Sequence, residues 1–93
     1  ALERRVIERE VRIVNSLGLH ARPAAQLVRL ASSFESEVEL VKDGVPVNSK
    51  SIMGVMMLAA ECGCQLIVRA TGADAEAAAA AMAELIASGF GET

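Results

Sequence analysis

Aromatic side chains are almost absent from this sequence, which has two Phe and no Trp or Tyr in 93 residues. The core must therefore be built from Ala, Val, Leu, Ile and Met. No apolar run approaches the ~18–20 residues that a membrane-spanning helix needs, so we expect no membrane insertion. Basic residues are outnumbered, nine against twelve acidic, for a net charge of −3. Because binding a phosphate backbone requires a basic face, this balance argues against nucleic acid as the main partner.

Cysteine is also scarce, with only Cys62 and Cys64 on either side of Gly63. Two ligands do not complete a zinc site, and no second Cys or His pair exists to finish one. The two positions are too close for an unstrained disulfide. We therefore expect reduced, partly buried thiols, no metal and no cofactor. The absence of a signal-peptide pattern agrees with a reducing, cytoplasmic location.

The pattern of apolar residues predicts one α+β domain over residues 1–93. A chain this short buries only about 60–65% of its unfolded surface, so we expect a single modest core. The order β-α-β-β-α-β-α suggests an antiparallel four-stranded sheet with the helices packed on one face. Strands are predicted over 6–14, 37–42, 45–48 and 65–71, and helices over 21–32, 51–59 and 75–88.

Turn and cap residues support these boundaries. Asp43-Gly44 predicts a two-residue hairpin turn in which both positions take a positive φ. Pro46 marks the strand after that turn as an edge strand. Asp74 is predicted to cap the last helix, and Gly89 suits its end.

The only histidine, His20, lies where an apolar strand gives way to an apolar helix. Gly18 can take a positive φ, and Pro23 fits a first helical turn, where its missing N–H does no harm. His20 is therefore predicted at a helix N-terminus, whose free amides at Ala21 and Arg22 attract anions. Arg22 adds a fixed charge and a donor fork suited to phosphate. Since neutral imidazole is a good nucleophile near pH 7, we interpret His20 as a phosphate acceptor.

The competing interpretation is that His20 is a cap or surface residue, which is the commoner role of a lone His near a helix start. Its neighbours argue against that. Gly-Leu-His-Ala-Arg-Pro-Ala, residues 18–24, resembles the phosphorylation-site signature of the HPr family, the histidine phosphocarriers of the bacterial phosphoenolpyruvate-dependent phosphotransferase system. A second block, residues 48–56, resembles that family's regulatory-serine segment. The resemblance runs from about Val6 to the C-terminus and implies an open-faced α+β sandwich.

The resemblance also implies roles for individual residues. His20 would accept a phosphoryl group on Nδ1 from phosphorylated enzyme I and pass it to an EIIA-type protein. Arg22 and the amides of Ala21 and Arg22 would stabilise that group, and Asn15 would orient the loop. Ser51 matches the serine phosphorylated by HPr kinase/phosphorylase, and transcriptional regulators would be further partners. Such a carrier is a transfer intermediate rather than an independent enzyme, and we expect a monomer. Positions that touch partners in the family are matched by Arg29, Ile52, Met53 and Met56.

The short helix after Ser51 is apolar all round. Ser51 is a natural N-cap, because its hydroxyl can accept from amides two or three residues further on. The pattern alone allows two outcomes for the apolar residues: all are core, since Met fills gaps, or some stay exposed. The resemblance favours an exposed docking surface made by Ile52, Met53 and Met56.

Two other function classes compete with the phosphocarrier. The first is a regulatory protein-binding module that acts through Ser51 and the Ile52, Met53 and Met56 patch, with His20 idle. Related regulators without carrier activity have lost the histidine, which this chain keeps. The second is an independent enzyme with His20 as general base, which lacks a catalytic partner.

The branch of the family stays open on sequence grounds. The loop 15–18 and the ending 88–90 resemble the nitrogen-regulatory branch, whereas the block 51–56 resembles the sugar-transport branch.

Overall fold

A computed structural model describes residues 5–92 and shows the α+β open-faced sandwich, in the order β-α-β-β-α-β-α. Across these residues no helix combines the length and apolar character needed to cross a bilayer. The elements are β1 (Val6–Arg12), α1 (Ala21–Ser32), β2 (Glu37–Lys42), β3 (Val45–Asn48), α2 (Ile52–Met57), β4 (Gln65–Thr71) and α3 (Ala75–Ala87), followed by the 3-10 turn η2 (Gly89–Gly91).

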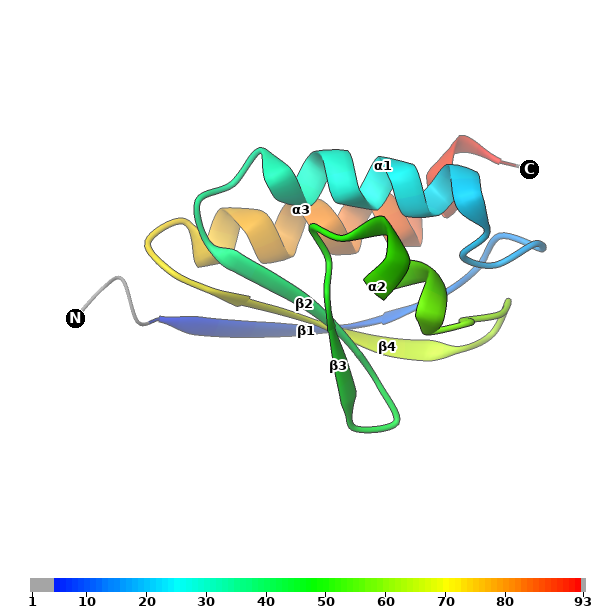
Figure 1. Ribbon diagram of the computed structural model, residues 1–93, viewed down its shortest axis with the longest axis horizontal. Coiled ribbons are helices and arrows are strands. Elements are labelled where there is room, and N and C mark those ends of the chain that lie inside the picture. The colour runs from blue at the N-terminus through cyan, green and yellow to red at the C-terminus, as the bar shows by residue number, and fades with distance from the viewer. Residues whose placement is uncertain (1–4, 93) are drawn as a thin grey trace.

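The four strands form one antiparallel sheet in the order β1-β4-β2-β3. The helices cover one face of this sheet, and the other face is open (Figure 1). On the open face, Arg69 lies between Glu8 and Glu39 of the neighbouring strands, with Nε 2.8 Å from Glu8 Oε2 and Nη1 3.3 Å from Glu39 Oε1. Because these charged side chains are partly exposed, they mark the solvent side of the sheet. Ion pairs of this kind contribute little to stability.

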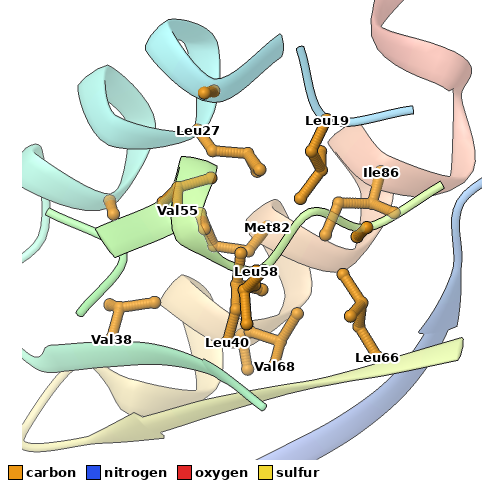
Figure 2. Packing of buried hydrophobic residues seen from close by; sticks show 14 of the residues in the cluster. Leu19, Leu27, Val38, Leu40, Val55, Leu58, Leu66, Val68, Met82 and Ile86 are labelled. Atoms are coloured by element: carbon orange, nitrogen blue, oxygen red, sulfur yellow. The ribbon is translucent and has the colours of Figure 1, made fainter. Parts of the chain in front are cut away.

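The core lies between the sheet and the helices (Figure 2). Its side chains are mostly aliphatic, as the composition predicts, with Phe90 as a buried aromatic exception. The three helices, β2 and β4 contribute buried residues, whereas β1 contributes only the partly buried Ile7 and Val11. Burying one such side chain contributes about 1.5–3 kcal/mol, so this layer supplies most of the favourable free energy of folding. The largest fully buried side chains are those of Ile13, Leu27, Leu40, Leu66, Met82 and Ile86.

The predicted boundaries agree with the structure to within one residue, except for two that differ by two residues. Asp43 and Gly44 take φ values of +51° and +80°, as the predicted turn requires, and β3 is an edge strand. β1 ends at Arg12 rather than at residue 14. α2 ends at Met57 rather than at residue 59, because Ala59 has a left-handed φ of +51°, which an α-helix does not continue through.

The predicted position of Asp74 at the start of the last helix is confirmed, but its side chain does not cap that helix. Asp74 occupies the N-cap position of α3, but its side chain makes no capping hydrogen bond. Its carboxylate instead accepts hydrogen bonds from the amides of Glu35 and Ser36, both at 2.9 Å, and from the Ser36 hydroxyl. Asp74 therefore ties the start of α3 to the chain segment that enters β2.

The two cysteines are free thiols. Cys64 is half-buried, as expected, whereas Cys62 is exposed. Partial burial was therefore wrong for Cys62, because the loop between α2 and β4 carries it on the surface.

Candidate functional site

The loop between β1 and α1 is held against the start of the α2–β4 loop. The Leu19 amide donates to Ala60 O at 2.9 Å. Gly18 has φ +67°, and a Cβ there would lie 2.5 Å from Ala60 O, so this position requires glycine for both conformation and space. These contacts fix the direction in which the chain enters α1.

His20 is the N-cap residue of α1, with an extended backbone at φ −77° and ψ −174°. Its carbonyl accepts the first hydrogen bond of the helix, from the Ala24 amide at 3.0 Å, but its side chain makes no capping bond. Within residues 5–92, no hydrogen bond engages the amides of Ala21 and Arg22. Pro23 lies buried in the first turn, as predicted. The start of α1 therefore offers unpaired donors beside the imidazole, and the helix dipole favours an anion there.

The imidazole is bound along one edge. Its Nε2 lies 2.9 Å from Oε2 of Glu92, and the side chain of His20 is 35% exposed. Asn15, which is buried, donates from Nδ2 to Glu92 Oε1 at 3.0 Å and to Gly18 O at 2.8 Å. Among the described residues, no hydrogen bond involves Nδ1 of His20. Within the described part of the chain, Nδ1 is thus free of hydrogen-bond partners, on the residue that immediately precedes α1.

Glu92 reaches His20 because the chain turns back after α3. Gly89, Phe90 and Gly91 all have positive φ values, of +74°, +60° and +75°. Phe90 is buried and anchors this turn, with its carbonyl 3.4 Å from Nε2 of Gln26 in α1. The C-terminal segment consequently lies beside the start of α1 (Figure 1).

The Glu92 carboxyl has a lowered pKa. Burial by itself raises this pKa, but the hydrogen bonds from Asn15 and His20 lower it more, helped by the charge of Arg22 and, when the imidazole is protonated, by that of His20. Glu92 is therefore ionised at neutral pH and only accepts hydrogen bonds. Sequence reasoning missed Glu92 as a site residue. The two glycines around Phe90 signal a turn, but nothing local indicates where that turn leads.

Arg22, the second predicted phosphate ligand, is exposed at the start of α1. Its guanidinium takes part in no ion pair within residues 5–92. The group is therefore not committed to a structural contact and can reach an anion placed at the helix start. Asn15 lies where the sequence placed it, inside the loop, with its amide bonding the loop to Glu92.

Ser51 is the N-cap of α2, as predicted, and its Oγ accepts from the Gly54 amide at 3.2 Å. In this helix only Val55 is fully buried. The predicted exposed residues are indeed exposed, by 44% for Ile52, 71% for Met53 and 42% for Met56. Met57, 78% exposed, belongs to the same surface and was not predicted. Arg29 is exposed in the last turn of α1.

Within residues 5–92, no three His, Cys, Asp or Glu side chains gather closely enough to hold a metal ion. The site is built instead from one imidazole, a carboxylate, an amide side chain and a helix start. This combination suits a nucleophilic nitrogen beside an anion-binding position.

Comparison with known proteins agrees with this chemistry. The family model described as the PTS HPr component phosphorylation site matches residues 7–88. The phosphocarrier protein HPr of Treponema pallidum is 46% identical over 87 residues, covering 94% of this chain and 99% of that protein. A crystal structure of HPr-C-His from Thermoanaerobacter tengcongensis has a TM-score of 0.89 at 46% identity, covering 94% and 98%. An HPr dimer from the same organism has a TM-score of 0.74 at 48% identity, covering 88% and 94%. The chain therefore belongs to the HPr family, the phosphocarriers of the phosphotransferase system.

Proposed function

We propose that this HPr-family chain carries its phosphoryl group on His20. It accepts the group from phosphorylated enzyme I and passes it to an EIIA-type protein, acting as a transfer intermediate. The observation that carries the proposal is that, among the described residues, neither Nδ1 of His20 nor the first two amides of α1 have a hydrogen-bond partner.

The transfer step follows from this arrangement. The Nδ1 lone pair attacks phosphorus, and the bond from phosphorus to the donor atom breaks with its electron pair leaving on the donor. Negative charge is then spread over the three phosphoryl oxygens. The amides of Ala21 and Arg22, the dipole of α1 and the Arg22 guanidinium stabilise that charge. Onward transfer reverses the same motion toward the acceptor.

Partner docking and regulation belong to α2 in this proposal. The docking patch for enzyme I and EIIA-type proteins is formed by the exposed residues Ile52, Met53 and Met56 of α2. Arg29, in the last turn of α1, adds a positive charge to this patch. Exposed Met side chains adapt to differently shaped partners. Ser51 is a phosphorylation site for HPr kinase/phosphorylase, and transcriptional regulators are further partners. A phosphate at this helix start is electrostatically favoured, which supports modification without unfolding.

Intact mass spectrometry after incubation with phosphoenolpyruvate and enzyme I tests the proposal. Wild type should gain one acid-labile phosphoryl group, and His20→Ala should gain none, because His20 is the only histidine. Circular dichroism and the melting temperature should stay close to wild type in this variant, since the side chain is partly exposed. Acid-labile label on the variant would contradict the role of His20.

A regulatory binding module with His20 idle is the second candidate. It is favoured by α2, which exposes Ile52, Met53, Met56 and Met57 and fully buries only Val55. The same mass measurement separates the two functions, because an idle His20 takes up no phosphoryl group from enzyme I.

A further inference from the structure

We propose that Glu92 is the positioning residue of His20, holding the ring in the tautomer that keeps its proton on Nε2 and leaves the Nδ1 lone pair free. The inference rests on the proposed phosphoryl-accepting role of His20. It assigns a task in the reaction to a residue 72 positions further along the chain, which does not itself touch the phosphoryl group.

The two oxygens of Glu92 face different groups. Oε1 accepts from Asn15 Nδ2 at 3.0 Å, and Oε2 lies 2.9 Å from Nε2 of His20. The direction of the Asn15 amide is fixed, because its Nδ2 also donates to Gly18 O at 2.8 Å and a reversed amide would place its oxygen against two acceptors. The carboxylate therefore accepts from both sides.

The tautomer of His20 follows from that arrangement. An ionised carboxylate has no proton to donate, so Nε2 must carry the hydrogen of the bond to Oε2. A neutral imidazole has a single N–H, and hence Nδ1 is left with its lone pair. The charged groups around this ring are Glu92 from the C-terminal segment and Arg22 from the first turn of α1. The lowered pKa of the Glu92 carboxyl keeps the acceptor ionised under physiological conditions.

The backbone that carries Glu92 is specialised for this placement. Three successive residues adopt left-handed φ values, and the middle one, Phe90, is not glycine. Such a conformation persists only where the surroundings determine it, here through burial of the Phe90 ring and the contact of its carbonyl with Gln26. The turn returns the chain to the start of α1 and delivers the carboxylate to the imidazole.

The carboxylate also matches the charge that the reaction creates. As the Nδ1 lone pair forms its bond to phosphorus, the ring becomes positive while its proton stays on Nε2. The Glu92 carboxylate at 2.9 Å compensates that charge. When the group moves on, the bonding pair leaves phosphorus and returns to Nδ1, and the ring is neutral again. No proton has to enter or leave the ring in either direction.

A positioning role and a merely structural role of Glu92 predict opposite orders of severity for the variants Glu92→Gln and Glu92→Ala. In Glu92→Gln, the amide oxygen must face the Asn15 donor, so the amide N–H points at Nε2 of His20. Nε2 then accepts, and the ring proton moves to Nδ1, where it blocks attack. Glu92→Ala imposes no tautomer. A structural role of Glu92 would instead make the isosteric Gln the milder change. Glu84→Gln removes an exposed carboxylate from α3 and is the matched control.

Two readouts are needed, and the lone histidine makes both unambiguous. The ¹⁵N shifts of the His20 ring, in mildly alkaline buffer, report the tautomer. The rate of His20 phosphorylation is measured with phosphoramidate, a donor that needs no docking, and with phosphorylated enzyme I. We expect an Nε2–H ring in wild type, an Nδ1–H ring in Glu92→Gln, and phosphorylation at least ~10-fold slower in that variant. Glu92→Ala should lose less, and Glu84→Gln should match wild type.

The opposite order overturns the inference: a Glu92→Gln protein that keeps the Nε2–H tautomer and reacts as fast as wild type, or faster than Glu92→Ala. Failure of the proposed function looks different. In that case wild type takes up no phosphoryl group from either donor, while its ring still shows the Nε2–H tautomer that Gln inverts.

Discussion

The starts of α1 and α2 use the same helix position in opposite ways. At α1, the side chain of the N-cap residue His20 bonds to Glu92 and not to the helix, and the amides of Ala21 and Arg22 have no hydrogen-bond partner among residues 5–92. At α2, the Ser51 hydroxyl accepts from the helix itself, through the Gly54 amide. One helix start therefore keeps its donors for an incoming anion, and the other satisfies them internally.

Helix length and burial explain why the two ends can differ. α1 has twelve residues and buries Pro23, Ala24, Leu27 and Ala31, so packing holds it without a side-chain cap. α2 has six residues, contains Gly54 and fully buries only Val55. Short helices are marginal on their own, and a cap is a large part of what stabilises this one. Packing therefore stabilises α1 without a side-chain cap, and the lack of a cap leaves its first amides available to bind an anion.

Removing the charge at the α1 start should give the largest effect. Arg22→Ala should slow phosphoryl transfer in both directions by at least ~10-fold, a ΔΔG‡ of about 1.4 kcal/mol, because the guanidinium stabilises the transferring group. Thermal stability should barely change, since the side chain is exposed and makes no ion pair among the described residues. Rapid-quench rates and melting curves test both points.

Arg9→Ala is the matched control, because it removes an exposed arginine from β1, away from the helix starts. A wild-type rate in Arg22→Ala would mean that the backbone amides and the partner protein suffice to stabilise the transferring phosphoryl group. The difference between the starts of α1 and α2 would then lie in the α1 amides alone.

The converse change, removing the cap of α2, should affect stability rather than chemistry. Ser51→Ala leaves the Gly54 amide without its acceptor and should lower the free energy of unfolding by about 1 kcal/mol. Urea unfolding measures this loss, and Ser51→Thr, which keeps the hydroxyl, should recover most of it. A stability loss no larger than that of Ser32→Ala, an exposed position at the end of α1, would show that α2 does not depend on its cap.

Sequence alone predicted the features that depend on near neighbours. The bounds of α1, the turn at Asp43, the cap at Ser51 and the exposure of Met53 all follow from residues within a few positions. The same holds for the placement of His20 at a helix start, because Gly18 and Pro23 flank it.

Contacts between distant segments were not predictable in this way. The bonds of Glu92 to His20 and Asn15 join positions 72 and 77 residues apart, and those of Asp74 to Ser36 span 38. Asp at a helix start is usually a cap, and only the fold brings the loop before β2 close enough to compete for its oxygens. The hydrophobic pattern determines which face of a helix or strand is buried. It does not determine which polar side chains from distant segments contact one another.

A negative charge at Ser51 should produce a smaller effect on rate. Phosphorylation, or Ser51→Asp as an imperfect mimic, places charge beside the apolar residues Ile52 and Met53, where docking must remove water. We expect phosphorylation of His20 by enzyme I to slow by about 3-fold, or about 0.7 kcal/mol, with the melting temperature level or slightly higher. With phosphoramidate, which does not dock, Ser51→Asp should match wild type.

An unchanged rate with enzyme I would leave Ser51 as a cap only. A slower rate accompanied by a collapse in melting temperature would instead point to unfolding of α2, and the docking explanation would be wrong.

The third helix start should show the smallest effect, visible mainly as a dependence on pH. Hydrogen bonds, first from the Ser36 hydroxyl and then from the Glu35 amide, hold the pKa of Asp74 below its ordinary value of 3.8, although burial opposes this. Because the folded pKa is lower than the unfolded one, the stabilisation is present above the ordinary value and is lost as pH falls through the folded pKa. Asp74→Asn should therefore be less stable than wild type at neutral pH, and the difference should shrink in acid.

Asp43→Asn, at an exposed turn with a positive φ that Asn tolerates, should show no such convergence. If urea titrations gave parallel pH profiles for wild type and Asp74→Asn, Asp74 would not link α3 to β2 through its charge, and the start of α3 would depend on packing alone.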